Sequence, residues 1–377
     1  MNLRKIQDVK KELKGARVIC RVDFNVPIKE SGIVMSDFRI KATLPTINFL
    51  KEAGAKIILI SHIGRAPNES LAPVANYLKQ NLGMNVDFVS SIFGSEIEDK
   101  IDSLEDGGIV MLENLRSDPG ETSNDSFFSK QLAEYADIYV NDAFAVSHRE
   151  HASIVGLPKE IPAFAGLRMQ EEINHLLLKN MNHPVLAVIG GLKFETKEPL
   201  VERLLDDVES LYLCGALAHD FYRAEGFEIG TSVHGDSIPK DDLIENKKIT
   251  IPSDVLVENG ARKEYKKSDQ VLHNEKIVDI GTESLEELKE LSRTAKTIIW
   301  NGPFGWYEGG YDKGTIEYLE FLADLDSNII IGGGDTVGLI EKMSLINRFS
   351  FVSTGGGAML EFLEKGSLVA LEYLKDK

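Results

Sequence analysis

The chain has 377 residues, of which 43% are hydrophobic and 27% are charged, and its formal net charge is −18. This composition is typical of a soluble folded protein, and the length suffices for two domains with separate cores. The acidic excess argues against nucleic acid as a partner, since nucleic-acid binders usually show a basic surface. No apolar run approaches membrane-spanning length.

The N-terminal residues and the cysteines indicate a compartment. The N-terminus, MNLRKIQDVKKELKG, has no apolar signal core, so we expect a cytoplasmic location. Cys20 and Cys214 both lie in apolar runs. They are therefore predicted to be small buried residues of a reduced protein, neither a disulfide pair nor a metal site. We also expect a monomer that contacts no membrane.

The first half of the chain alternates predicted strands with predicted helices. Strands are expected at 17–25, 56–61, 108–112 and 137–140, and helical segments at 40–53, 71–82 and 125–135. Alternation of this kind predicts a mostly parallel sheet with helices on both faces.

Each of these strands ends in polar or cationic side chains. The groups are Arg21, Asp23 and Asn25, then His62 and Arg65, then Asn114 and Arg116, then Asn141 and Asp142 with His148 and Arg149 beyond, and Arg39 follows the first strand. In open parallel sheets, ligands bind outside the carboxyl ends of the strands. A cluster of arginines there, in an acidic chain, predicts an anionic ligand, because the guanidinium fork binds carboxylate and phosphate in a bidentate way.

Taken alone, each of these residues has a simpler explanation. A single arginine at a strand end is usually solvated or paired, and Asp23 is expected to pair with one of them. His148 and His151 share an i,i+3 spacing, but no cysteine or acidic partner completes a zinc pattern. Ser147 beside His148 is a poor candidate nucleophile, because sequence neighbours do not by themselves form the required geometry.

The second half repeats the strand–helix pattern but ends its strands in glycine. Helical periodicity at 165–180 fits a long helix joining two domains, and strands are expected at 184–189, 211–214, 249–251, 277–279, 297–300, 329–331 and 349–354. Glycine-rich strand-to-helix turns accommodate a polyphosphate and a flat base. The first domain therefore suggests a site for a small anion, and the second a nucleotide site.

The segment Asn328–Thr336, NIIIGGGDT, is the most informative of these turns. A buried strand runs into Gly332, Gly333 and Gly334, and Asp335 and Thr336 then open a predicted helix at 337–343. A helix N-terminus favours anions, so a carboxylate there makes sense if a cation such as Mg²⁺ bridges it to nucleotide phosphates. The alternative, favoured for an isolated motif of this kind, is that Asp335 caps the helix. Neither a P-loop nor a dinucleotide fingerprint occurs in the chain.

A series of short segments, taken together, is more specific than any one of them. They occur in the order RVDFNVPI, SHIGR, LENLR, YVNDAF, GGLK, WNGPFGWYE, GGGDT and STGGGA. This series closely resembles the phosphoglycerate kinase family, from about Arg17 to Gly357. The resemblance implies an α/β fold of two Rossmann-like, doubly wound parallel-sheet domains joined by a long helix, with a cleft between them. It also implies phosphoryl transfer between 1,3-bisphosphoglycerate and MgADP, giving 3-phosphoglycerate and MgATP.

The resemblance assigns roles to individual positions of this chain. It places phosphoglycerate at Arg21, Asp23, Asn25, Arg39, His62, Arg65, Arg116 and Arg149. It places the nucleotide at Gly190, Gly191, Lys193, Gly215, Asn301, Pro303, Glu308, Gly332, Gly333, Gly334, Asp335 and Thr336, with Asp335 on the metal. It places catalysis at Arg39, Lys197, Gly355, Gly356 and Gly357. We expect a phosphoglycerate-binding domain at 1–164, an interdomain helix at 165–180, a nucleotide domain at 181–348, and a segment at 349–377 that returns to the first domain.

The chain departs from the family pattern mainly beside the expected base. Leu192 stands where the family usually has alanine, and Ala216 where it usually has glycine, so a reshaped base slot is predicted. A carboxylate acceptor is already ionised near neutral pH, so no general base is required and alignment with charge neutralisation can suffice. The alternatives are a non-catalytic phosphometabolite-binding protein and, more weakly, an NAD-dependent dehydrogenase.

Overall fold

The structure is a computed structural model that describes residues 2–376, and the chain forms two compact units. The first contains the residues up to Asn174 together with the segment from Ser367 onward, and the second runs from His175 to Gly366. The sequence placed these boundaries at 164 and 349. The difference at the second boundary arises because β15 (Phe351–Val352) pairs with β14 (Asn328–Gly332), which keeps it in the second unit.

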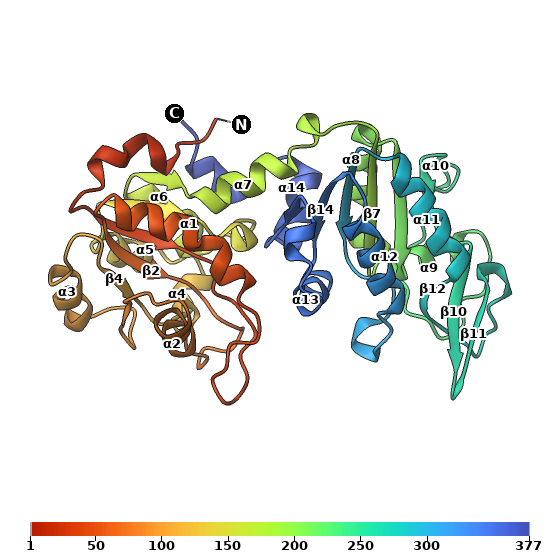
Figure 1. Cartoon of the computed structure of the whole chain (residues 1–377), viewed down its shortest axis with the longest axis horizontal. Helices are drawn as coiled ribbons and strands as arrows, with labels where there is room; N and C mark the ends of the chain where they lie inside the picture. The colour runs from red at the N-terminus through yellow and green to blue at the C-terminus, as the bar shows by residue number, and fades with distance from the viewer. Residues whose placement is uncertain (1, 377) are drawn as a thin grey trace. The chain divides into compact units, whose positions relative to one another are not determined.

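The first unit is built on a six-stranded sheet in which every neighbouring pair is parallel, in the order β3-β4-β2-β1-β5-β6. Its strands are β1 Arg17–Arg21, β2 Lys56–Ile60, β3 Asp87–Phe88, β4 Ile109–Met111, β5 Ile138–Asn141 and β6 Ala163–Ala165. Its helices are α1 Phe38–Glu52, α2 Ala72–Asn81, α3 Ser95–Asp102, α4 Pro119–Thr122, α5 Ser126–Ala133 and α6 Leu157–Glu160, with α7 Leu167–Leu176 leading out of the unit (Figure 1).

Local sequence accounts for most of these elements. The run Ile57–Ile60 is fully buried, as expected for a strand covered on both faces. Asp125 begins α5 because its carboxylate accepts hydrogen bonds from the amides of Phe127 and Phe128, which satisfies two of the unpaired donors at a helix start. The short strands β3 and β6 were not predicted, because two or three residues give no measurable periodicity.

The second unit contains another six-stranded parallel sheet, in the order β15-β14-β13-β7-β8-β9. The strands not yet given are β7 Val185–Gly191, β8 Ser210–Gly215, β9 Ile249–Thr250 and β13 Thr297–Asn301. The helices are α8 Glu198–Asp207, α9 Ala216–Ala224, α10 Asp241–Ile244, α11 Thr282–Thr294, α12 Lys313–Ala323, α13 Gly334–Lys342 and α14 Gly357–Lys365 (Figure 1). The expected fold class, two doubly wound parallel-sheet α/β domains, is confirmed.

A small antiparallel sheet in the second unit was not predicted. It has the order β11-β10-β12, with β10 at Asp254–Asn259, β11 at Arg262–Lys267 and β12 at Lys276–Ile280. Residues 277–279 do form part of a strand, but this strand pairs with β10 in the antiparallel sheet. The prediction that they belong to the parallel pattern was therefore wrong. The signal for this hairpin was present: Gly260 and Ala261 form its two-residue turn, with Gly260 at φ +60° in the first position.

The connecting helix is shorter than predicted. α7 ends at Leu176, because Leu177 adopts an extended conformation, and residues 178–180 form a separate 3₁₀ turn. Cys20 and Cys214 are both buried and free, as predicted, and burial raises the pKa of each thiol. Across residues 2–376, none of the helices is long and apolar enough to cross a membrane.

Candidate functional site

The topology of the first sheet brings its polar strand ends together. The chain order reverses at β1, whose neighbours are β2 on one side and β5 on the other. Such a switch point is where ligands bind in doubly wound sheets. Arg21 ends β1 and is fully buried, with its guanidinium donating to the hydroxyl of Ser153 and to the carbonyl of Val22. Its donors are therefore committed mainly to protein atoms.

Arg21 also determines the tautomer of His62. Arg21 Nη2 lies 3.1 Å from His62 Nδ1, and because arginine can only donate, Nδ1 must accept. Burial and the neighbouring charges of Arg21 and Arg116 lower the pKa of His62 well below its ordinary value. The neutral ring therefore carries its proton on Nε2, where it can donate to an anion.

Burial and neighbouring positive charge lower the pKa values of two further basic side chains at this edge. Burial lowers the pKa of Arg116, and the charges of Arg149 and Arg21 lower it further. Burial together with Arg116 and Arg21 lowers the pKa of His151 to about 4. We call this set, Arg39, His62, Arg116, Arg149 and His151, the basic cluster. Arginines held close together beside neutral histidines are typical of a site whose ligand is an anion.

Arg39, a member of the basic cluster, lies in the first turn of α1. Its Nη1 lies 3.3 Å from Asp23 Oδ2 and donates to the backbone carbonyl of Asn25 at 3.0 Å. Asp23 is almost fully buried, so this pair orients the guanidinium more firmly than a surface ion pair would. Asn25 in turn accepts the amide of Gly64 through its side-chain oxygen, which ties the loop after β1 to the loop after β2.

The remaining predicted anion ligands are more open. Arg65 and Arg149 are both exposed. The fully buried Asn114 holds the loop around Arg65, because it binds both the amide and the carbonyl of Ile63 and the carbonyl of Glu69. Sequence reasoning named Asn114 only as a strand end, and its role is to position this loop.

Glu121 is a member of this edge that the sequence did not indicate. It is fully buried, accepts from the amide and hydroxyl of Ser153, and lies 3.8 Å from His151 Nδ1. The negative charge of this buried carboxylate reduces the repulsion between the nearby arginines. Because it is buried, it leaves their solvent-facing side free for a ligand. Glu121 lies in the short helix α4, ten residues after the end of β4, and no pattern around it offered a signal. Ser147, the weak nucleophile candidate, is buried and donates to the carbonyl of Ala143.

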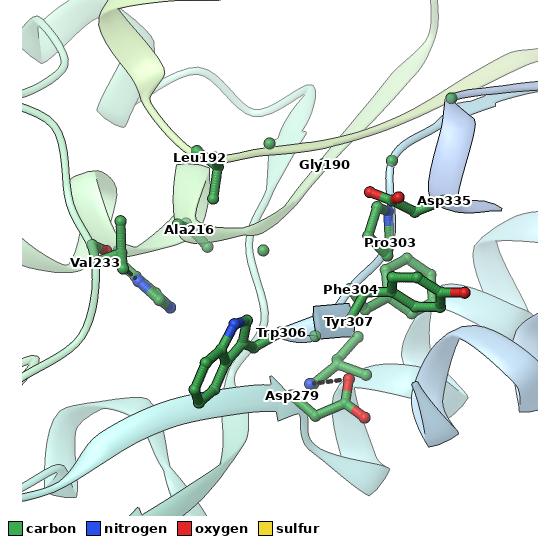
Figure 2. Close-up of a pocket in the computed structure, with 18 of the residues that line it drawn as sticks. Gly190, Leu192, Ala216, Val233, Asp279, Pro303, Phe304, Trp306, Tyr307 and Asp335 are labelled. Carbon is green, nitrogen blue, oxygen red and sulfur yellow. Dashed lines mark hydrogen bonds between the residues drawn. The ribbon is translucent and has the colours of Figure 1, made fainter. Parts of the chain in front are cut away.

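The second unit contains a pocket of about 580 Å³ at its own switch point, between the ends of β7 and β13 (Figure 2). Its lining includes Gly190, Gly191, Leu192, Lys197, Gly215, Ala216, His219, Val233, Lys276, Asp279, Asn301, Gly302, Pro303, Trp306, Glu308, Gly333, Gly334, Asp335, Gly356 and Gly357. Most of the predicted nucleotide residues therefore line one cavity. Figure 2 shows Asp335 near one end of it and Val233 near the other, with Leu192, Ala216 and Trp306 between.

Two glycines allow the backbone to take the path that it follows around this pocket. A Cβ at Gly190 would lie 2.7 Å from the carbonyl oxygen of Pro303, so β7 and the loop after β13 approach each other only because no side chain intervenes. Gly333 precedes α13 with φ +99°, a conformation that other residues rarely adopt.

Asp335 is not the cap of α13. The helix begins at Gly334 with Gly333 as N-cap, and no side chain caps it. Asp335 is exposed, and within residues 2–376 its carboxylate makes no hydrogen bond or ion pair. Partial burial and the charge of Glu308 raise its pKa. Two carboxylates facing one pocket fit a cation, and Mg²⁺ typically uses one or two protein carboxylates plus substrate phosphates.

Several predicted nucleotide ligands do not line the pocket. Lys193 lies 3.6 Å from both Glu195 Oε1 and Asp236 Oδ2. Thr336 is fully buried, and its hydroxyl has no hydrogen-bond partner among the described residues. Gly332 packs against Met359. Gly355, which was predicted to be catalytic, does not line the pocket either, and its amide donates to the hydroxyl of Ser353.

The pocket also includes residues that the sequence did not indicate. Trp306 is 43% exposed, its amide donates to the carbonyl of Val278, and Lys276 Nζ lies 3.2 Å from its ring centroid. His219 lies one helical turn after Ala216 on α9, so the two share a face. Trp306 could have been found from its place in the glycine-rich segment after β13, whereas His219 had no such signal.

Comparison with known proteins agrees with this geometry. Residues 6–366 match the family model described as phosphoglycerate kinase. The chain belongs to the phosphoglycerate kinase family. A phosphoglycerate kinase of Coprothermobacter proteolyticus is 41% identical over 381 residues, covering 97% of this chain and 96% of that protein. One from Herpetosiphon aurantiacus is 40% identical over 396 residues, and the match covers the whole of both chains.

Solved structures of phosphoglycerate kinases match in fold as well. The enzyme from Pyrococcus horikoshii has a TM-score of 0.87 at 30% identity, and the structure from Coxiella burnetii has 0.81 at 34% identity. Each match covers 99% of this chain and 98% of the other. Family membership makes this chain a phosphotransferase of glycolysis that works with Mg²⁺ and ATP or ADP. The dehydrogenase and non-catalytic alternatives are therefore set aside.

Proposed function

We propose that the basic cluster of the first unit binds 3-phosphoglycerate or 1,3-bisphosphoglycerate, and that the pocket of the second unit binds MgADP or MgATP. The observation on which this division rests is the contrast in charge between the two sites. Arginines gather beside neutral histidines at the first switch point, whereas an unpaired carboxylate, Asp335, faces the second pocket. A small polyanion matches the first site, and a metal-bound phosphate chain matches the second.

We infer that the phosphate chain lies at the Asp335 end of the pocket. Lys197 lines that pocket, and within the described chain it makes no hydrogen bond or ion pair, while partial burial lowers its pKa. Gly356 and Gly357, at the start of α14, also line the pocket, so backbone amides there are available to phosphate oxygens. When bound at Asp335, Mg²⁺ would neutralise phosphate charge.

The acceptor chemistry explains why no general base is assigned. The nucleophile is a carboxylate, which is ionised near neutral pH. The residues of this chain then need only align the reactants and stabilise charge that builds on the transferring phosphoryl group. We assign that stabilisation to Arg39 and Lys197. Phosphoglycerate binding is assigned to Arg65, Arg116 and Arg149. Arg21 is assigned to orienting the ring of His62 through its contact with Nδ1.

Three further inferences concern partners, compartment and assembly. The net charge of −18 supports a protein that binds no nucleic acid. We also infer a cytoplasmic monomer. Light scattering coupled to size-exclusion chromatography at micromolar concentration would show a single 41.8 kDa species if the monomer is correct.

A coupled assay with MgATP and 3-phosphoglycerate tests the central proposal. We expect turnover, loss of it with the metal chelated, and separate defects in two variants. Arg149→Ala should raise the KM for 3-phosphoglycerate, while Asp335→Asn should raise the KM for MgATP. A variant that shifted the KM of the wrong substrate would overturn the division between the two units.

A further inference from the structure

The far end of the pocket, away from Asp335, contains a side chain that can distinguish one nucleotide base from another by hydrogen bonding. His219 is 94% buried, since only 6% of its surface is exposed, and it lines the pocket. Its Nδ1 lies 2.7 Å from the carbonyl oxygen of Val233. A carbonyl can only accept, so Nδ1 carries the proton. Within residues 2–376 the other ring nitrogen makes no hydrogen bond, so any polar contact with a ligand is made by Nε2.

The protonation state of His219 makes Nε2 an acceptor. Burial lowers the pKa of the ring, which is therefore neutral near neutral pH. With Nδ1 protonated, Nε2 presents a lone pair. An acceptor of this kind suits an amino group and repels a carbonyl oxygen. The bond to Val233 also restrains ring rotation, so the acceptor is held in place before a ligand arrives.

The walls of the pocket restrain where a base can lie. Leu192 and Ala216 lie on one side and Trp306 on another (Figure 2). Trp306 is itself held, because Lys276 covers one face of its ring and Tyr311 stacks at 6.2 Å between centroids. With phosphates at the Asp335 end, a base among these walls would direct its outer edge towards Val233, the residue to which His219 is bonded.

We propose that His219 is a specificity-determining residue that selects a 6-amino purine over a 6-oxo purine through Nε2. The proposal rests on the nucleotide site assigned above. Adenine presents an amino donor at position 6, whereas guanine and hypoxanthine present an acceptor there. A buried acceptor that meets another acceptor loses a hydrogen bond and gains repulsion. Hypoxanthine is the sharper probe, because it differs from adenine only at the 6 position and the adjacent N1 proton.

The test compares the dissociation constants of MgADP and MgIDP by calorimetry in the full chain. We expect the native protein to bind MgADP at least tenfold more tightly. His219→Asn keeps an amide donor for the Val233 carbonyl but removes the outer acceptor, so the ratio should fall below threefold, mainly through weaker MgADP binding. His219→Gln places an amide oxygen near the position of Nε2 and should retain more than threefold. Melting curves confirm folding, and if the Asn variant does not fold, the native MgADP:MgIDP ratio decides by itself, because a ratio below threefold overturns the proposal.

The matched control is His234→Asn. His234 lies on the same loop as Val233 and bonds the carbonyl of Gly235, but it does not line the pocket. Its substitution should leave the MgADP:MgIDP ratio unchanged. A native ratio below threefold, or a folded His219→Asn protein that keeps the tenfold ratio, overturns the assignment of His219. Failure of the native protein to bind either nucleotide would instead refute the proposed nucleotide site.

Discussion

Asp23 Oδ2 lies 3.3 Å from Arg39 Nη1, and the carboxylate is almost fully buried while the guanidinium is partly exposed. This pair, with the bond from Arg39 to the carbonyl of Asn25, restrains the arginine at the edge of the first sheet. A guanidinium restrained in this way loses little conformational freedom when it meets a phosphoryl group. The relationship explains why Arg39, among several arginines at this edge, is the one assigned to catalysis.

Arg39→Ala is therefore expected to lower kcat by several hundredfold or more, with little change in ADP affinity. Charge on a transferring phosphoryl group peaks in the transition state, and an arginine there is worth roughly 10³–10⁵ in rate in other systems. Arg149→Ala is the control and should mainly raise the KM for phosphoglycerate. Steady-state kinetics with melting curves decide the matter. A folded Arg39→Ala enzyme with more than about a tenth of native kcat, a change below about 1.4 kcal/mol, removes Arg39 from this role.

Asp335→Asn should abolish the Mg²⁺ dependence of ADP binding and leave the fold intact. The carboxylate makes no hydrogen bond or ion pair with the described residues and does not cap α13, so its loss should cost little stability. Calorimetry with ADP, in the presence and absence of Mg²⁺, measures the effect. An unchanged response to Mg²⁺ in the variant would mean that the metal is held elsewhere.

The pocket walls should also influence base preference. Leu192 is 71% exposed at the rim, and Ala216 opens α9. Replacing them together, Leu192→Ala with Ala216→Gly, should change the ATP:GTP ratio of kcat/KM because the base gains room to shift. If the ratio stays within about twofold, under about 0.5 kcal/mol, these two positions do not shape the base slot.

His151 should make the protein lose stability in mild acid. Its folded pKa is about 4 against an ordinary 6.5, so the unfolded chain binds the extra proton and stability falls as the pH drops from about 6.5 to about 4. In His151→Gln this component disappears. Thermal unfolding of both proteins at pH 7 and pH 5 should therefore show a smaller acid-induced decrease for the variant. An equal decrease in both would show that His151 titrates normally.

Asp142 should act with the opposite sign. Burial raises its pKa to about 6 from 3.8, so its contribution to stability is greatest below pH 3.8 and is lost as the pH rises through 6. Its Oδ1 also accepts the amide of Met169 in the first turn of α7. Asp142→Asn retains an acceptor and should be at least as stable as native at pH 7. Asp142→Ala loses it and should cost about 0.5–2 kcal/mol. Chemical denaturation at pH 7 would contradict this if the two variants were equally stable.

Much of the fold and part of the site could be predicted from local sequence. Runs such as Ile57–Ile60 alternate with helical segments, and this predicts parallel sheets because a buried strand needs helices on both faces. The residues at strand ends predicted where ligands bind, since parallel strands place their carboxyl ends at one edge. The turn at Gly260 also carried a local sequence signal, but the hairpin was not predicted from it.

By itself, the sequence determined the strand–helix order, the polar strand ends and the family of the chain. Only the tertiary structure decided that Arg21 is buried beneath His62, that Asp335 is unpaired, and that His219 and Trp306 line the same cavity. The reason is physical. Periodicity and turn chemistry depend on residues a few positions apart, whereas burial, pKa and tautomer depend on which distant segments pack together. His219 and its partner Val233, 14 positions apart, belong to this second kind.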